Sequence, residues 1–212
     1  MSIETSSPSL GVQPSRCVIG VTGLKGCGKS EFTNALTLHE SFTRVHPATP
    51  IREMLVPLLQ AFNYDASTIA KMLDGSLKRR IIPELGRTPT ELQQTLGTEW
   101  GRNLVKPDLW TDLWRRKARL PHRVINDSVR FENEAQMILS ENGWLIHVHR
   151  PGLPMDDTHP SEHYARLLPV HYVIINSGTV EHLHKIALEF FDWTLSQDPA
   201  QTPMFTPISK GY

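Results

Sequence analysis

Residues 17–30, CVIGVTGLKGCGKS, are the most informative part of this chain. The first six are apolar and rich in β-branched side chains, which is typical of a short buried strand. The next eight, from Gly23 to Ser30, satisfy the pattern G-x-x-x-x-G-K-[ST] without a mismatch, and a helical segment over residues 30–39 follows. Glycines in such a loop allow backbone N–H groups to turn toward a phosphate, and the helix N-terminus adds positive potential. The stretch therefore predicts a phosphate-binding loop.

On this interpretation, eight consecutive residues surround the phosphates of a nucleoside triphosphate: Gly23, Leu24, Lys25, Gly26, Cys27, Gly28, Lys29 and Ser30. Lys29 would bridge the β- and γ-phosphates, and Ser30 would hold Mg²⁺. Cys27 lies at a helix N-terminus beside Lys29, where the pKa of a thiol can be lowered. The simpler interpretation is that Cys27 is a small residue that fills a loop position. The chain has no N-K-x-D element, so a GTPase switch is disfavoured.

Beyond this stretch, short apolar runs alternate with helical patterns, which predicts an α/β fold of the P-loop NTPase type. The parallel sheet should have about five strands and be covered by helices. Strands are expected at residues 17–22, 123–126, 144–149 and 171–176, with a weaker one at 42–45, and helices at 30–39, 51–62, 90–102, 132–141 and 179–195. Residues 63–121 are too long for an ordinary crossover, so we expect a helical insertion that binds substrate.

The composition limits the class of protein. The 212 residues carry 22 Lys and Arg against 22 Asp and Glu, so a generally polyanion-binding protein is disfavoured. Two cysteines cannot build a disulfide framework or a four-thiolate zinc site. No apolar run approaches the ~18 residues of a membrane span, and the first residues lack a signal-peptide pattern. We therefore expect a cytoplasmic protein with one domain at 16–196, a disordered tail at 1–15 and a C-terminal tail at 197–212.

Six strings give the sequence a more specific resemblance: GSLK at 75–78, LGRTPTELQQTLGTEWGR at 85–102, PDLW at 107–110, VRFENEA at 129–135, HPSE at 159–162 and NSGT at 176–179. In this order they are similar to bacteriophage deoxynucleoside monophosphate kinases, with a match from about residue 17 to residue 190. The resemblance implies a kinase of the nucleoside monophosphate kinase type. Such an enzyme moves the γ-phosphate of ATP to a deoxynucleoside monophosphate, with ATP and Mg²⁺ as cofactors, and supplies precursors for phage DNA. It also implies a lid over about residues 150–168.

The candidates for acceptor binding are Lys78, Arg87, Gln94, Trp100, Arg102, Asp108, Trp110 and Arg130. Their cationic members could clamp a 5′-phosphate, which a guanidinium does with two parallel hydrogen bonds. Gln94 offers a donor and an acceptor to a base edge, and the two tryptophans could stack on a base. Asp108 could contact the sugar or the base. Each has a structural alternative, which is an exposed surface position for the polar residues and the core for the tryptophans.

The candidates for catalysis are Lys29, Asp127, Arg130 and Arg150. Asp127 closes the strand at 123–126, where it would hold Mg²⁺ together with Ser30 or cap the following helix. Related sequences carry Asp directly before the Val-Arg-Phe string. Here Ser128 takes that place, and we favour Asp127 because serine supplies no charge.

Arg130 would face the transferred phosphoryl group, and Arg150 would do so from the lid, unless it lies in a plain surface loop. Asn176 and Gly178 resemble the loop that borders the adenine, and a capping turn would use the same residues.

The expected partner is a small-molecule substrate. We expect neither a stable nucleic-acid partner nor a membrane, and a homodimer is compatible with the sequence. A phage-encoded chain would act in the cytoplasm of the host cell. Two alternatives stay open. One is a kinase for a hydroxymethylated base in DNA or in a nucleotide, for which the basic stretch at 115–123 could follow a polymer backbone. The other is a non-catalytic nucleotide-binding protein.

Overall fold

The computed structural model describes residues 16–153 and 165–207. The strands are β1 (Cys17–Thr22), β2 (Thr43–Arg44), β3 (Arg123–Asn126), β4 (Trp144–His149) and β5 (Tyr172–Ile175). They form one sheet with the order β2-β3-β1-β4-β5, and every neighbouring pair is parallel. The predicted α/β class and the five-stranded parallel sheet are therefore confirmed, and they include the weak strand near residues 42–45.

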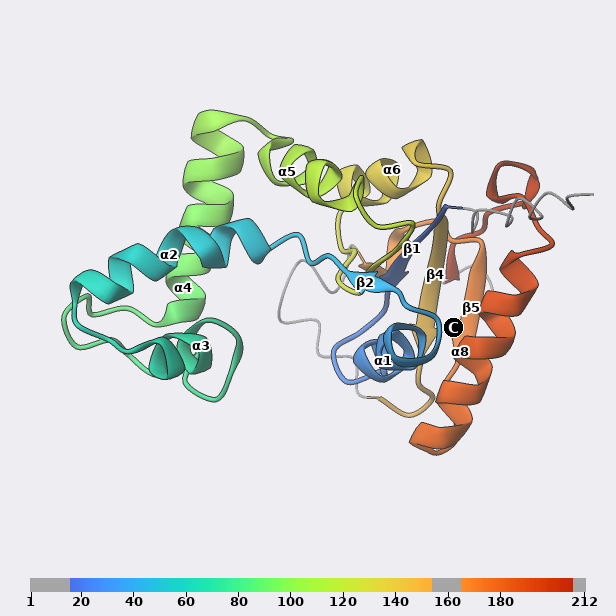
Figure 1. Ribbon diagram of the computed structural model, residues 1–212, viewed down its shortest axis with the longest axis horizontal. Helices are drawn as coiled ribbons and strands as arrows, with labels where there is room; N and C mark the ends of the chain where they lie inside the picture. Colours follow the sequence, from blue (N-terminus) through green and yellow to red (C-terminus); the bar gives the residue numbers. More distant parts are fainter. Residues whose placement is uncertain (1–15, 154–164, 208–212) are drawn as a thin grey trace, which may run out of the picture.

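The helices, in chain order, are α1 (Lys29–His39), α2 (Thr49–Ala61), α3 (Ala66–Asp74), α4 (Pro89–Gln94), the π-helix η1 (Thr95–Val105), α5 (Leu109–Ala118), α6 (Glu132–Ser140), α8 (Val180–Thr194) and the short 3₁₀-helix η2 (Pro199–Gln201). Successive side chains of each strand point to opposite faces of the sheet, so both faces need cover. Helices α1 and α8 lie on one face, and α5 and α6 lie on the other (Figure 1). Both layers leave the carboxyl ends of the strands open to the phosphate loop.

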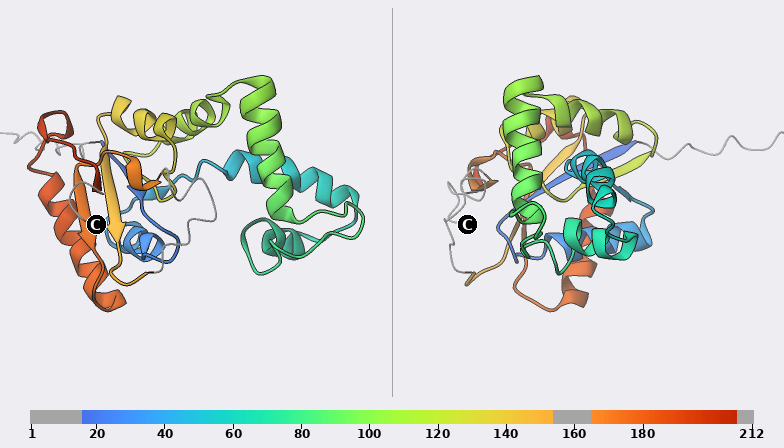
Figure 2. Two further views of the ribbon diagram at one scale, coloured as in Figure 1. Left: turned by 180° about the vertical axis from the view of Figure 1, so that it is seen from behind. Right: turned by 90° about the vertical axis from the view of Figure 1, so that its left-hand side faces the viewer.

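Helices α2, α3 and α4 form a lobe that projects from the sheet (Figure 2). The lobe has its own apolar core of Leu55, Leu59, Ile69, Met72, Leu73 and Ile82. Since two of these side chains come from α2, the helical insertion begins near residue 49 and not at 63. At its other end α5 packs on the sheet, with Trp114 and Ala118 in the core of the domain.

The helix expected at 90–102 consists of two consecutive parts in the structure. The α-helix α4 ends at Gln94, and the π-helix η1, which has wider turns, continues from Thr95. Two buried glycines, Gly97 and Gly101, lie in η1. A Cβ atom at Gly101 would lie 2.4 Å from the Trp110 ring, so only glycine allows this close approach. The indole Nε1 of Trp110 donates to the Gly97 carbonyl at 2.6 Å. These contacts join the lobe to α5.

The segment 197–207, expected to be part of a tail, is packed on the domain. Phe205 exchanges two backbone hydrogen bonds of 2.9 Å with Val170, and Met204 and Phe205 pack on the core between the sheet and α6. The prediction of a tail from residue 197 is therefore wrong for these residues, because their few apolar side chains find a site beside β5. Within the described residues no helix has the length and apolar character that crossing a membrane requires.

Candidate active site

The phosphate loop connects β1 to α1, as its motif predicts. Gly23 and Gly28 have φ angles of 135° and 106°, which strongly favour glycine. A Cβ atom at Gly23 would also lie 2.4 Å from the carbonyl oxygen of Val148 in β4. The Lys29 Nζ atom donates to the carbonyls of Gly23 and Leu24, at 2.7 Å each. The lysine ammonium therefore lies over the loop, at the place where phosphates would bind.

Side chains behind the loop hold its shape. The Asn176 Nδ2 atom donates to the Cys27 carbonyl at 2.9 Å, and the Asn176 backbone N–H donates to His149 at 2.7 Å. Asn176 thus ties the end of β5 to the loop, while Gly178 is exposed before α8. Burial raises the pKa of the Cys27 thiol more than the neighbouring Lys29 lowers it. Cys27 is 1% exposed and fits the simpler interpretation of a small residue that fills a loop position.

Asp127 and Ser30 lie on either side of a single arginine. Asp127 follows β3, is 8% exposed and places Oδ2 3.5 Å from the Nε atom of Arg44. The Arg44 Nη2 atom also donates to the backbone carbonyl of Ser30 at 3.4 Å. The neighbouring Ser128 donates its N–H to the Asn126 side chain at 3.0 Å. The structure thus places the carboxylate of Asp127, preceding Ser128, near the start of α1.

The arrangement fits a magnesium ion bound together with a nucleotide. The Oδ1 atom of Asp127 is buried without a hydrogen-bond partner in the described part of the chain. Mg²⁺ prefers oxygen ligands and keeps several waters, so one carboxylate and one hydroxyl suffice when phosphates supply the rest. No group of three or more metal-ligating side chains occurs in the described ranges 16–153 and 165–207. Ser30 and Asp127 would therefore hold Mg²⁺ only together with phosphate oxygens.

A cavity of about 160 Å³, here called the inner cavity, lies where the lobe meets the sheet. It is lined by His46, Pro47, Ala48, Ile51, Gln93, Gly97, Thr98, Arg102, Trp110, Ser128, Arg130, Phe131 and Glu134. Two guanidinium groups, from Arg102 and Arg130, share its wall with the residue that follows Asp127. The inner cavity therefore contains two positively charged side chains and lies close to Asp127, the candidate magnesium ligand.

Glu134 organises one wall of the inner cavity. Its carboxylate, in a residue only 5% exposed, accepts hydrogen bonds from the Arg102 Nη2 atom at 3.0 Å and from the backbone N–H groups of Arg130 at 2.9 Å and Phe131 at 3.4 Å. The Arg102 guanidinium also lies over the Phe131 ring, 4.9 Å from its centroid. Burial raises the pKa of Glu134, while Arg102 and the two N–H groups oppose that rise. One carboxylate thus connects η1 of the lobe to the loop before α6.

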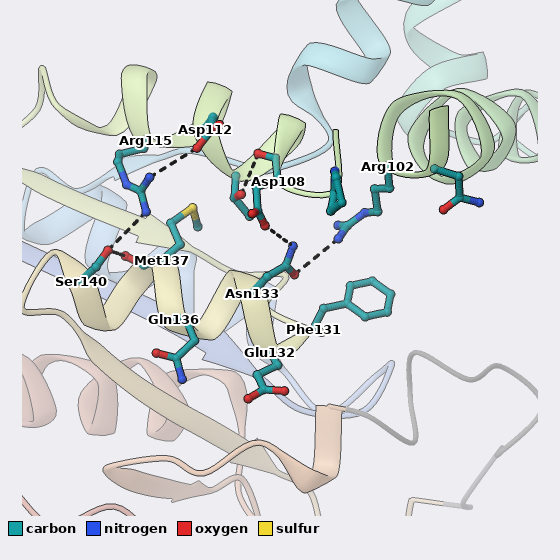
Figure 3. Close-up of a pocket in the computed structure, with 13 residues that line it drawn as sticks. Arg102, Asp108, Asp112, Arg115, Phe131, Glu132, Asn133, Gln136, Met137 and Ser140 are labelled. Carbon is teal, nitrogen blue, oxygen red and sulfur yellow. Dashed lines mark hydrogen bonds and ion pairs between the residues drawn. The ribbon is translucent and has the colours of Figure 1, made fainter. Parts of the chain in front are cut away.

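A larger cavity of about 860 Å³, here called the outer cavity, opens between α5 and α6 (Figure 3). Asn133 accepts from Arg102 at 3.4 Å and donates to Asp108 at 3.3 Å across it. Arg115, farther along, pairs with Asp112 at 3.4 Å. Arg115 and Asp112 of the outer cavity thus pair with each other, and neither Ser128, which follows Asp127, nor Arg130 lines this cavity. The inner cavity is therefore the better candidate for an acceptor site, despite its smaller volume.

The structure separates the acceptor candidates into three groups. Arg102, Arg130 and Trp110 line the inner cavity, and Arg102 lines the outer cavity as well. Trp110 is 2% exposed, and its indole N–H donates to the Gly97 carbonyl. Asp108 lines the outer cavity only. The others line neither of these two cavities, and they are the exposed side chains of Lys78, Arg87, Gln94 and Trp100.

Several of these expectations need correction. Gln94 is exposed, and its neighbour Gln93 lines the inner cavity. Arg87 forms an exposed 3.6 Å ion pair with Glu91, and the Trp100 ring centroid lies 6.4 Å from that of Trp110. Arg87 and Lys78 are exposed on the lobe. This agrees with the alternative interpretation, in which these cations are surface residues that bind no substrate.

Four polar residues of the site were missed by the sequence analysis: Arg44, His46, Arg52 and Gln93. Arg52 donates to Asp74 at 2.8 Å and to Gln93 at 3.4 Å, and Gln93 donates to the Leu73 carbonyl at 3.0 Å. The position of two of them in the sequence could have identified them. Arg44 ends β2 and His46 follows it, and ligands of such folds bind at the carboxyl ends of the strands.

The end of β4 holds a buried histidine and an exposed arginine. His147 is 3% exposed, and its pKa is lowered to about 4 by burial and by the nearby charges of His149, Lys29 and Arg166. Arg150 follows β4 and is exposed. The predicted lid residues between 154 and 164, with the HPSE string, lie outside the described residues.

The chain is similar to several known proteins. The family model for deoxynucleotide monophosphate kinase matches residues 89–186. A candidate deoxynucleotide monophosphate kinase of Acanthamoeba polyphaga mimivirus is 28% identical over 192 residues, covering 82% of this chain and 96% of its own. Among solved structures, the dephospho-CoA kinase of Campylobacter jejuni aligns with a TM-score of 0.46 and 15% identity, over 82% of this chain and 95% of its own. A sugar kinase from Janibacter sp. HTCC2649 aligns with a TM-score of 0.41 and 17% identity, over 84% and 95%.

Proposed function

We propose that this chain, a nucleotide kinase by its resemblance to the deoxynucleotide monophosphate kinase family and by its phosphate loop, transfers the γ-phosphate of ATP to a deoxynucleoside monophosphate. The products would be ADP and the deoxynucleoside diphosphate. The observation that carries the proposal is the inner cavity. It places Arg102 and Arg130 beside Ser128, one residue from Asp127.

The donor side of the reaction would use the phosphate loop. The Lys29 ammonium, now over the carbonyls of Gly23 and Leu24, would turn to the β- and γ-phosphates when they bind. Mg²⁺, held by Ser30 and Asp127 with phosphate oxygens, would supply further neutralisation of charge. Arg44 keeps these two residues together by contacting both. The ammonium of Lys29 and the magnesium ion would thus offset the negative charge of the leaving ADP.

The acceptor side would use the inner cavity. A phosphate oxygen of the acceptor would form a bond to the γ-phosphorus as the bond from that phosphorus to the β-phosphate oxygen breaks, and the electron pair would leave with ADP. Arg130 and Arg102 would hold the acceptor phosphate and offset the charge that both phosphates bring together. The phosphate is already ionised at neutral pH, so the step needs no general base. Positioning and charge neutralisation are therefore sufficient roles for the residues present.

The alternative of a kinase that acts on DNA has little support from the basic stretch at 115–123. Arg115 pairs with Asp112 and Glu141, Lys117 pairs with Glu53 at 2.7 Å, and Arg123 pairs with Glu40 at 2.9 Å. These three cations already contact carboxylates of the same chain, whereas Arg116 and Arg119 of the stretch are exposed. A polymer backbone would have to compete for the three paired cations.

The proposal is tested by supplying ATP, Mg²⁺ and each common or modified deoxynucleoside monophosphate in turn and separating the products by chromatography. Formation of a diphosphate from at least one of them supports the proposal. Lys29→Ala serves as the control for a contaminating kinase. If no monophosphate is converted while hydroxymethylated DNA becomes labelled, the proposal is wrong.

A further inference from the structure

His46 lies directly after the chain leaves β2 and lines the inner cavity, yet none of the steps above uses it. The turn that holds it leads into α2. The Thr49 backbone N–H donates to the His46 carbonyl at 3.0 Å, and the Ala48 N–H donates to the His46 side chain at Nδ1, also at 3.0 Å. Both backbone and ring of His46 are therefore fixed by the same short turn.

The hydrogen bond from Ala48 determines where the imidazole carries its proton. A ring nitrogen that accepts from an N–H group has no hydrogen of its own. The proton of His46 must then be on Nε2, and the ring is uncharged while this bond exists. The Nε2–H group forms no hydrogen bond with any residue in the ranges 16–153 and 165–207. The Nε2–H group of the uncharged His46 ring is therefore available to donate a hydrogen bond to a ligand.

Charged groups from three neighbouring elements act on the pKa of this ring. They are Arg52 from α2, Asp74 from the end of α3, and Asp127 and Arg130 from the loop after β3. Burial lowers the pKa of His46 to about 4, and the two arginines act in the same direction, while the two carboxylates oppose them. The surroundings therefore favour the uncharged ring that the turn requires.

We propose that His46 binds the phosphate of the acceptor through its Nε2–H group, as a neutral hydrogen-bond donor beside the guanidinium of Arg130. The inference rests on the proposed function, because it assigns the inner cavity to a monophosphate. His46 lines the inner cavity together with Arg130 and Ser128, the residue that follows Asp127. A neutral donor positions a phosphate oxygen without adding a further charge that must be desolvated.

The variant His46→Asn separates binding from folding. An asparagine side chain accepts a hydrogen bond from the backbone N–H two residues later, which is the bond that His46 now accepts from Ala48. The turn into α2 should therefore survive, but the shorter side chain cannot reach the position of Nε2. His46→Gln is the complementary variant, since its longer amide restores a distal N–H. His122→Asn, at an exposed histidine outside both cavities, is the matched control.

The measurements are the KM values for the deoxynucleoside monophosphate and for ATP, kcat, and the Tm of each variant. A hydrogen bond from a neutral donor to a charged phosphate predicts an increase in the acceptor KM of about 10-fold or more for His46→Asn. The KM for ATP should stay within about twofold and the Tm within a few degrees. His46→Gln should recover part of the acceptor affinity even if it is less stable. An unchanged acceptor KM in His46→Asn, or an equal loss for both substrates, would overturn the inference.

Calorimetric binding of the same monophosphate, without ATP, keeps this test independent of turnover. Binding to the wild type that weakens in His46→Asn supports the role of His46 even if no phosphate is transferred, in which case only the proposed reaction is wrong. Turnover by the wild type with unchanged binding in His46→Asn overturns the inference and leaves the reaction standing. A wild type that binds no monophosphate overturns both.

Discussion

Replacing Glu134 by alanine would test how the lobe is connected to the sheet. The carboxylate accepts from Arg102 at 3.0 Å and from the Arg130 and Phe131 N–H groups, so its removal leaves one charge and two backbone donors without this acceptor. Losing one partner of a buried ion pair costs about 3–5 kcal/mol. Arg102 is partly exposed and keeps its contact with the Phe131 ring, so we expect the lower end, about 3 kcal/mol. For a chain of this size that corresponds to a Tm lower by about 6–12 °C.

The assay is thermal unfolding followed by circular dichroism, with kinetics measured on the same samples. Glu134→Gln keeps the shape and one acceptor oxygen, so it should cost less, about 1–2 kcal/mol. Glu132→Gln is the matched control, because Glu132 lies in the same first turn of α6 and is exposed. The acceptor KM should rise in both Glu134 variants because Arg102 and the loop before α6 lose their common support. A Tm for Glu134→Ala within about 2 °C of the wild type would refute this reasoning, since a buried pair cannot be removed at so small a cost.

Further predictions concern single residues of the site. Lys29→Ala should reduce kcat by a factor of about 10²–10³ or more with little change in Tm, and wild-type turnover in this variant would show that the phosphate loop is not the active site. Asp127→Asn should reduce kcat steeply and raise the Mg²⁺ concentration for half-maximal rate, whereas Ser128→Ala should do neither, and the reverse order would assign the metal-side role to Ser128. Arg102→Ala should raise the acceptor KM by about 10–150-fold and leave the KM for ATP nearly unchanged, and equal effects on both would remove Arg102 from the acceptor site. The pKa of His147 is about 4 in the folded chain and 6.5 in the unfolded one, so its contribution is fully present above pH 6.5 and is lost as the pH falls toward 4. Denaturant titrations over this range should show a decrease in the free energy of unfolding of up to about 3 kcal/mol from His147, and an equal decrease in His147→Gln would contradict this assignment.

The sheet and the loop could be predicted because their signals are local. The apolar run of β1 and the motif from Gly23 to Ser30 determine a strand, a turn and a helix without reference to distant residues. The outer bounds of the lobe could not be predicted in this way. Leu55 and Leu59 in α2 have the pattern of any amphipathic helix, and only the folded chain shows that they pack against α3 and not against the sheet.

Gln94 was a candidate for contact with a base edge, and in the structure it has the exposed helical position that was its alternative. Consecutive residues of helix α4 point in different directions, so Gln93 lines the inner cavity while Gln94 is exposed. Trp110 is 2% exposed and packs against Gly101 of η1, which matches the core alternative for this tryptophan. His46 carried no motif, because its role depends on the turn after β2 and on charges from α2, α3 and the loop after β3.

The most direct measurement of the central claim is the ratio of kcat/KM for a deoxynucleoside monophosphate to that for hydroxymethylated duplex DNA, with ATP and Mg²⁺ at saturation. The proposed function predicts efficient conversion of at least one monophosphate, loss of that activity in Lys29→Ala, and weak binding of DNA with a shallow dependence on salt, because few phosphates would be neutralised. Efficient labelling of the DNA, inert monophosphates and a salt dependence that indicates several phosphate contacts would contradict it.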